Sequence, residues 1–327
     1  MDHLECVTTK RNRWYWYLIV LFMSYIVANT LGAIPFMSIM MWNLFRSRGI
    51  GDNDMALATD WMKLSTEGID TNVMLAVTLF IFIVLLVAGA FFIRQLQGRS
   101  WTEVVNGTRR VRWGHFFGGF AVWGAINVVV FAVGYVMDPD NFEFCFDVWR
   151  FIPLLLIAVT MIPIQAASEE FFFRGYLAQG VASWTHSRWW TLVVPSVLFG
   201  LMHTANPEVT EYGFWVMMPQ YILLGAMFGL AALLDDGIEV AMGAHAVNNL
   251  LGAVLTTYKG AALQTDALFM AREIDPTGDL PGMMLSAVVF VGVLSYLYKW
   301  KFGILNQPVP PPHPESVDST TLTFTQG

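Results

Sequence analysis

Long apolar stretches recur along the whole of this 327-residue chain, and they restrict its fold more than any other feature. A helix needs about 20 mainly apolar residues to cross roughly 30 Å of bilayer hydrocarbon. Five stretches meet this requirement plainly, at residues 14–41, 73–93, 116–137, 214–234 and 283–300. Three more contain polar interruptions, at residues 151–182, 189–203 and 238–258. We therefore predict an all-α fold, a polytopic membrane helical bundle of about eight transmembrane helices.

The composition excludes an ordinary soluble domain. Hydrophobic residues make up 56% of the chain and charged residues only 13%, and the mean hydropathy is +0.53. We expect the lipid bilayer as a partner and no nucleic acid. Cys6 and Cys145 are the only cysteines. Their number and spacing support neither a disulfide framework nor a structural zinc site, and the redox compartment stays open.

Basic residues gather in one set of the loops between the apolar stretches. If the N-terminus lies inside, the inner loops hold Lys10, Arg11, Arg13, Arg94, Arg99, Arg109, Arg110, Arg112, Arg188, Lys299 and Lys301. The outer loops hold fewer basic residues, set among acids. The positive-inside rule then predicts a multi-pass protein of the cell membrane with both termini in the cytoplasm. The first apolar run is longer than the core of a signal peptide, so we expect it to be retained as a helix.

These patterns divide the chain into five parts. We expect a cytoplasmic N-terminus over residues 1–13 and about three transmembrane helices over 14–150. The polar interruptions fall in a core over residues 151–258. An outer loop and the last transmembrane helix cover 259–302, and a tail rich in Pro, Ser and Thr, predicted to be disordered, covers 303–327.

The first polar cluster is a pair of glutamates followed by an arginine. An ionisable group at membrane depth costs at least ~2.5 kcal/mol, so it needs a partner or a purpose. On a helix Glu170 and Arg174 lie on one face at i, i+4, whereas Glu169 points about 100° away from Glu170. Glu170 can be neutralised by Arg174 while Glu169 stays free to act. The alternative is a purely structural ion pair.

Two further clusters supply imidazoles and carboxamides. His203 ends the fifth apolar stretch, and His245 lies one turn before Asn249 on a shared helix face in the seventh. A Glu and a His can bind and deprotonate a water, while a second His and an Asn donate hydrogen bonds to an oxyanion. Each residue alone is more often a packing residue bonded to a neighbouring carbonyl or helix. Their conjunction favours catalysis.

Positions along the helices support part of this grouping. If a hairpin turns near His186, Glu170 and His203 lie 16 and 17 residues from the turn, roughly 25 Å along each helix. His245 fits less well, because it lies only nine residues after Asp236 at the corresponding turn. Tilt, a longer turn or a protruding hairpin would close this gap. The membrane face to which the site opens stays undetermined.

The motifs EExxxR, FxxxH and HxxxN occur here in order as Glu169-Glu170 with Arg174, Phe199 with His203, and His245 with Asn249. In this the chain resembles the CPBP family of CAAX proteases and bacteriocin-processing enzymes, which includes the type II CAAX prenyl endopeptidases. The resemblance covers roughly residues 151–258. It implies an intramembrane glutamate-type endopeptidase in which Glu169 and His203 activate water. His245 and Asn249 would then form the oxyanion hole, with Glu170 and Arg174 as support. Asn248 could replace Asn249 if the helix register differs.

We expect no cofactor, because neither HExxH nor another compact ligand pair is present and the polar set suffices alone. The alternative is a divalent metal such as zinc, held by Glu169, His203 and His245.

The expected activity is hydrolysis of peptide bonds in membrane-associated peptide or protein substrates. The alternative from another class is a non-enzymatic membrane immunity, scaffold or regulatory protein of the same family. A transporter with a Glu and His proton relay ranks last, because no inverted repeat is evident. Nothing in the sequence indicates a prenyl pocket, and the substrate stays open.

Overall fold

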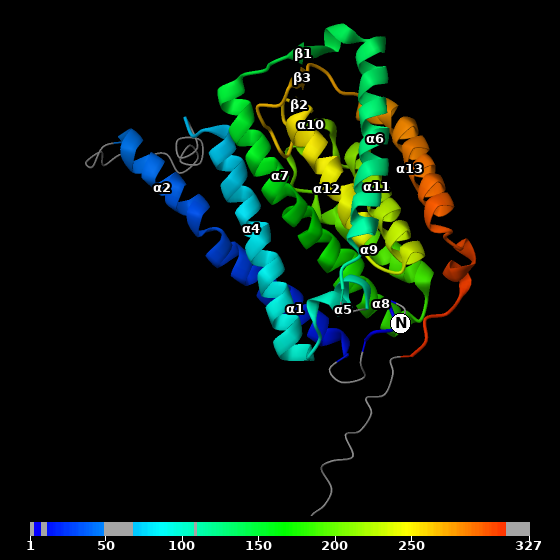
Figure 1. Ribbon diagram of the computed structural model, residues 1–327. Coiled ribbons are helices and arrows are strands. Elements are labelled where there is room, and N and C mark those ends of the chain that lie inside the picture. The colour runs from blue at the N-terminus through cyan, green and yellow to red at the C-terminus, as the bar shows by residue number, and fades with distance from the viewer. Residues whose placement is uncertain (1–2, 8–11, 49–67, 108–109, 312–327) are drawn as a thin grey trace, which may run out of the picture.

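The computed structural model describes residues 3–7, 12–48, 68–107 and 110–311. In this part of the chain the fold is a bundle of helices with one small sheet at the end of the bundle opposite the N-terminus (Figure 1). The fold class predicted from the apolar stretches is confirmed. The first half contains α1 Trp14–Val27, α2 Ile34–Arg48, α4 Thr71–Phe92, α5 Trp101–Asn106 and α6 Trp113–Met137. The second half contains α7 Val148–Glu170, α8 Ala178–Thr185, α9 Arg188–Met202, α10 Pro207–Tyr212, α11 Phe214–Asp235, α12 Glu239–Val254 and α13 Pro276–Tyr298.

Short irregular turns connect or extend several helices. π-helical turns at Ala28–Gly32, Ile93–Gln97 and Phe171–Leu177 join α1 to α2, extend α4, and join α7 to α8. Short 3₁₀ turns occupy Pro139–Asn141 and Phe302–Asn306. Each of the eight predicted stretches lies largely within helix, but the predicted count of eight spans is not confirmed. In the described residues six continuous helices are long and apolar enough to cross a membrane, Trp14–Arg46, Thr71–Gln97, Trp113–Met137, Val148–Thr185, Phe214–Asp235 and Pro276–Tyr298. The other two predicted stretches form α9, with 15 residues, and α12, with 16.

The small sheet was not predicted. Strands β1 Phe142–Phe144, β2 Thr256–Tyr258 and β3 Phe269–Ala271 lie in the order β1-β3-β2. Strand β1 pairs antiparallel with β3, opposing Phe142 to Ala271, and β2 pairs parallel with β3, opposing Thr256 to Phe269. The predicted stretch 238–258 therefore ends as a strand. The sheet ties the segments after α6 and α12 to the segment before α13.

Helix α12 lies at the centre of the bundle and packs against α6, α7 and α11. Glycines allow its backbone to approach α6 closely. A Cβ atom at Gly243 would lie 1.9 Å from the carbonyl oxygen of Phe116, and one at Gly119 would lie 2.2 Å from the carbonyl oxygen of Val240. Most of α12 is buried, including Ala241, Ala244 and Ala246, which have no exposed surface. Small residues at a membrane helix interface allow this close packing.

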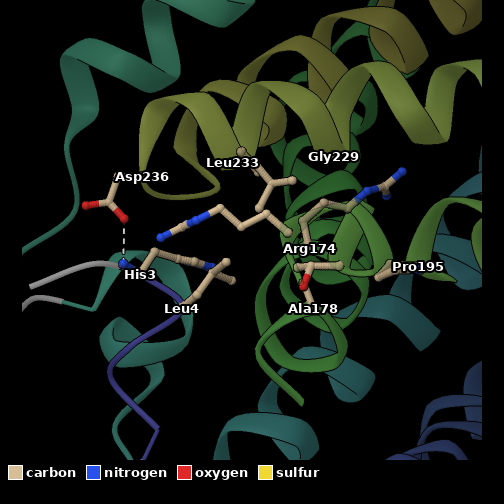
Figure 2. A pocket seen from close by; sticks show the side chains of 11 residues that line it. His3, Leu4, Arg174, Ala178, Pro195, Gly229, Leu233 and Asp236 are labelled. Carbon is tan, nitrogen blue, oxygen red and sulfur yellow. Dashed lines mark hydrogen bonds between the residues drawn. The ribbon is translucent and has the colours of Figure 1, made fainter. Parts of the chain in front are cut away.

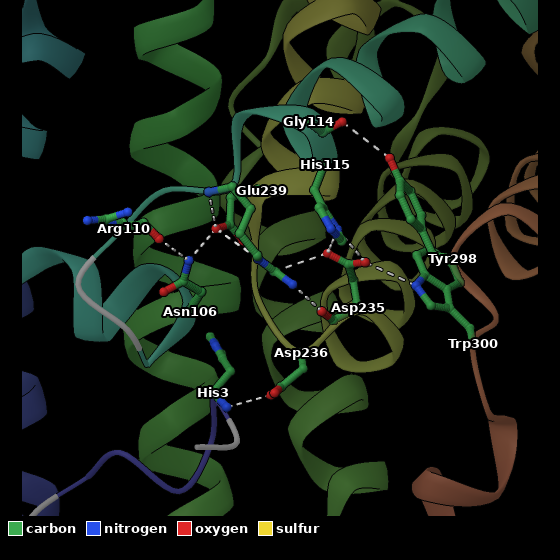
Figure 3. Close-up of polar contacts among 11 residues, drawn as sticks. His3, Asn106, Arg110, Gly114, His115, Asp235, Asp236, Glu239, Tyr298 and Trp300 are labelled. Atoms are coloured by element: carbon green, nitrogen blue, oxygen red, sulfur yellow. Dashed lines mark hydrogen bonds and ion pairs between the residues drawn. The ribbon is translucent and has the colours of Figure 1, made fainter.

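A polar network fixes the N-terminal end of α12 (Figure 3). The carboxylate of Glu239 accepts hydrogen bonds from the Arg112 backbone and guanidinium and from the Asn106 amide. At the adjoining end of α11, Asp235 pairs with Arg112 and accepts a hydrogen bond from Trp300 Nε1 at 3.0 Å. Nδ1 of His115 lies 2.9 Å from the same carboxylate. Because these groups compensate one another's charge, the start of α12 is held in one position.

Two turns fix the start of the helices that carry the site, the α8–α9 turn at His186 and the α11–α12 turn at Asp236. His186 ends α8 in the left-handed conformation, so the hairpin turns where the sequence predicted. Ala178, Leu233 and Asp236 line one small cavity of about 10 Å³ together with His3 of the N-terminal segment (Figure 2). Nδ1 of His245 lies 2.7 Å from Oε1 of Glu170, so the two residues reach the same depth although their residue counts from the two turns differ.

The C-terminal segment corrects one prediction. Phe302–Asn306 forms a 3₁₀ turn, and Ser187 and Pro308 form an isolated β-bridge. The side chains of Leu305 and Val309 are buried against Leu4 and α11. The prediction of a disordered tail is therefore wrong for residues 303–311, because apolar side chains in and before the proline-rich run complete a hydrophobic cluster. Residues 312–327 of that tail lie outside the described residues.

Candidate active site

A cavity of about 400 Å³ contains the four predicted catalytic residues. Glu169 from α7, His203 from the end of α9, and His245 and Asn249 from α12 all line it. Its wall also includes Tyr258 of β2 and the segment after it, so the cavity lies toward the sheet end of the bundle. Its volume falls in the range of about 300 to 1,000 Å³ typical of ligand sites. The predicted supporting residues Glu170 and Arg174 are not in the wall, but lie behind it.

Glu170 joins Arg174 to His245. The Arg174 guanidinium donates to Glu170 Oε1 at 2.9 Å through Nη1, and its Nη2 donates to the carbonyl of Gly225. Nδ1 of His245 donates to the same Glu170 oxygen at 2.7 Å. The Arg174 Cζ lies 4.2 Å from the centre of the Phe199 ring. The predicted i, i+4 ion pair is thus present, fully buried, and also orients the imidazole of His245.

Glu169 turns toward the cavity. Its Oε1 accepts a hydrogen bond of 2.6 Å from Gln165 Nε2, one turn earlier on α7. Its Oε2 lies 3.5 Å from His245 Nε2. His245 therefore stands between the two glutamates, with Glu170 at one ring nitrogen and Glu169 at the other. The sequence placed His245 beside Asn249 but did not predict this bridging position.

Gln165 is a site residue that the sequence reasoning missed. It is buried, donates to Glu169, and accepts a 2.9 Å hydrogen bond from Asn249 Nδ2. The sequence feature that could have identified Gln165 is an amide side chain at membrane depth, four residues before Glu169 on the same helix face. Asn248 lies beside Asn249 in the cavity wall, where its Oδ1 accepts a hydrogen bond from Trp123 Nε1. Asn248 donates in turn to Asn249 Oδ1 at 3.1 Å.

His203 reaches the cavity from another side. Its Nδ1 donates to the Phe199 carbonyl at 2.7 Å, and its ring stacks on Tyr221 with the ring centres 4.5 Å apart. In the neutral ring the proton then resides on Nδ1, which leaves Nε2 as a hydrogen-bond acceptor. Glu169 and His203 line the same cavity, as the equal levels along the two helices predicted.

The donors named for the zinc alternative do not form a ligand set. Within residues 3–7, 12–48, 68–107 and 110–311, no three His, Cys, Asp or Glu side chains converge so that they could hold a metal ion. A zinc site needs three or four such ligands at about 2.0 to 2.3 Å from the ion. The arrangement therefore does not fit the metal, and we derive no step through one.

The part of the chain that forms this site also matches a known protein family. The family described as type II CAAX prenyl endopeptidase Rce1-like matches residues 149–251. This chain contains an Rce1-like domain. The domain runs from the start of α7 into α12 and includes all six predicted site residues, which confirms the family recognised from the motifs. The domain occupies nearly the same residues as the core predicted at 151–258.

One curated relative extends the similarity beyond this domain. The uncharacterized protein YyaK of Bacillus subtilis (strain 168) is 27% identical over 209 residues, which cover 63% of this chain and 70% of YyaK. No solved structure matches the chain. The family match supports the Rce1-like domain, and the six long apolar helices support a multi-pass membrane setting, while the activity must be argued from the site.

Proposed function

We propose that this chain is an intramembrane endopeptidase that hydrolyses peptide bonds of membrane-associated peptides or proteins. The observation that carries the proposal is the meeting of Glu169, His203, His245 and Asn249 from three helices in the wall of one cavity. The Rce1-like domain at residues 149–251 supports the same reaction class. These groups supply a base, a water-orienting acceptor and oxyanion donors, and hydrolysis needs no other component.

In this proposal Glu169 is the general base. Its carboxylate takes one proton from water, while His203 Nε2 accepts a hydrogen bond from the O–H that the water keeps. The resulting hydroxide attacks the carbonyl carbon of the scissile bond, and the carbonyl oxygen becomes an oxyanion. The second hydrogen of the Asn249 amide remains available to this oxyanion, because the amide has two and only one is donated to Gln165.

His245 completes the oxyanion hole once it carries a second proton. Its Nε2 lies near Glu169 Oε2, so it can accept the proton that Glu169 has taken. The resulting imidazolium donates to the oxyanion, and Glu170 stabilises the positive charge from the Nδ1 side. Collapse of the intermediate breaks the carbon–nitrogen bond, and the proton passes to the leaving amine. We propose that no metal takes part, so a chelator should leave the rate unchanged.

The membrane orientation follows from the loop charges. We place both termini in the cytoplasm of a cell-membrane protein, which puts the sheet end of the bundle on the outer side (Figure 1). The cavity wall includes Tyr258 and Ala262 from that end. In this orientation the substrate reaches the site from the outer side or from the bilayer.

The test is a digest of membrane peptides with purified protein in detergent, analysed by mass spectrometry. Wild type should produce new termini that are missing with Glu169→Gln, which keeps the side-chain size but removes the base. Glu211→Gln is the matched control, because Glu211 is exposed on α10 and does not line the cavity. Identical products from wild type and Glu169→Gln would overturn the proposal.

A further inference from the structure

The active-site cavity contains a second carboxylate, which the proposed hydrolysis does not use. Glu208 lies in the first turn of α10, five residues after His203, and lines the same cavity as Glu169. Its residue surface is only 6% exposed. The sequence analysis did not single it out. An ionisable group buried in such a setting needs a partner, because an unpaired buried charge is strongly unfavourable.

The surroundings of Glu208 satisfy only one of its two oxygens. Oε1 accepts hydrogen bonds from the Tyr258 hydroxyl at 3.3 Å and from the Ala262 backbone amide at 3.1 Å. Burial raises the pKa of the Tyr258 phenol, and the charge of Glu208 raises it further, so Tyr258 stays a donor. Oε2 is enclosed and has no hydrogen-bond partner among the described residues. One carboxylate oxygen is thus held in place and the other is left for a ligand.

The charge of the cavity wall indicates which ligand fits. The acidic side chains in this wall are Glu169 and Glu208, and no lysine or arginine of the described residues lines it. Lys259 follows Tyr258 in sequence, but it is exposed and does not line the cavity. A cationic group would pair with Oε2 and relieve the repulsion between the two carboxylates. A metal ion fits less well, because no three suitable donors converge within the described residues.

We propose that Glu208 binds a positively charged group of the substrate, the side chain of a lysine or arginine near the scissile bond. The identity of the ligand as a peptide rests on the proposed function. Glu208 follows His203 by five positions, so the Cα atoms of the two residues lie at most roughly 17 Å apart. The cation therefore lies within about five substrate residues of the bond that is cut. A free C-terminal carboxylate in this position is disfavoured by the same charges.

The experiment measures binding separately from cleavage. The probes are pools of short random peptides that carry biotin and one benzophenone side chain, and purified wild type is photo-cross-linked to each pool. The first pool is acetylated and contains one lysine; the second is acetylated with norleucine in its place. The third has norleucine and a free amino terminus, which distinguishes an α-amine from a side-chain amine as the source of the charge.

Wild type should cross-link the lysine pool about tenfold more than either norleucine pool, and Glu208→Gln should reduce this preference to within about twofold. The glutamine keeps an acceptor for Tyr258 and Ala262. Glu211→Gln on the same short helix and Tyr258→Phe, which leaves the carboxylate in place, should both keep the preference. Equal labelling of all pools by wild type, or an unchanged preference in Glu208→Gln, would overturn the proposal. A preference for the third pool alone would overturn the side-chain assignment.

If the Glu208→Gln protein does not fold, a competition experiment on wild type tests the same site. Hexylamine, charged at neutral pH, should reduce labelling by the lysine pool, whereas hexanol should not. Equal effects of the two compounds would contradict a cation site. Lysine-dependent labelling without any cleavage would support the cation site and contradict the proposed peptidase activity. Cleavage without a lysine preference would support the peptidase activity and contradict the cation site.

Discussion

Nδ1 of His245 lies 2.7 Å from Oε1 of Glu170, although 75 residues separate them in the chain. The same oxygen accepts the hydrogen bond from Arg174. The contact fixes which nitrogen of His245 faces the cavity, and it connects the buried ion pair to the proposed oxyanion hole. Glu170 is thereby a positioning residue for His245, and Glu169 alone remains the proposed base.

The ion pair should matter for stability and for activity in separable ways. Glu170→Ala leaves the Arg174 charge buried without its carboxylate, which should lower the free energy of unfolding by about 3 to 5 kcal/mol. The double variant Glu170→Gln with Arg174→Met removes both charges and should regain most of that stability while activity stays low. Thermal unfolding in detergent and peptide cleavage measure the two effects. A double variant with full activity would show that the pair serves packing alone.

Gln165 should act through the residues that it positions. Gln165→Ala removes the hydrogen bonds to Glu169 and Asn249, so we expect the kcat to fall by roughly tenfold or more while KM changes little. Asn127→Ala is a matched control, because within the described residues this amide donates to the Trp123 carbonyl of its own helix and does not line the cavity. A change confined to KM would mean that Gln165 contacts substrate rather than the catalytic groups.

The neighbouring amides of α12 should differ in importance. Loss of the Asn249 donor in Asn249→Ala should lower turnover by roughly 10² to 10³ fold, as for other oxyanion donors. Asn248 accepts from Trp123 and donates to Asn249, so Asn248→Ala should cost less than about tenfold. Steady-state kinetics on one substrate compares the two variants. The reverse order would assign the oxyanion contact to Asn248.

The two native cysteines report the orientation in the membrane. Cys145 is exposed beside β1 at the sheet end, whereas Cys6 is buried near the opposite end. With cytoplasmic termini, a membrane-impermeant maleimide added to intact cells should label Cys145, and Cys145→Ser should abolish the labelling. Labelling of Cys145 only after the membrane is opened would reverse the orientation and place the sheet end in the cytoplasm.

Local spacing carried much of the site prediction. The i, i+4 spacing gave the Glu170–Arg174 pair directly, and residue counts from the turn at His186 predicted Glu170 and His203 at equal depth, so that the neighbouring Glu169 could share a site with His203. His245 could not be placed this way, because its depth depends on where the turn at Asp236 lies relative to the turn at His186. That offset is set by tertiary packing, which no single helix encodes.

Other features lay beyond what periodicity can detect. The three-residue strands form through pairing between distant segments, as between Phe142 and Ala271, and carry almost no pattern of their own. Gln165 and Glu208 are single polar residues, and part of the partners of Gln165 and all those of Glu208 lie on other elements. Helices α9 and α12 have the apolar character of membrane spans but are shorter. Hydropathy alone therefore predicted more long helices than the described residues contain.

The most direct test of the account is the cleavage rate of Glu169→Gln on an identified substrate, with the protein reconstituted in liposomes and compared with wild type and Glu211→Gln. We expect a loss of at least roughly 10² to 10⁴ fold for Glu169→Gln, the contribution of a general base, with unchanged thermal unfolding and a normal rate for Glu211→Gln. A Glu169→Gln rate within about tenfold of wild type would contradict the assignment of Glu169 as the base.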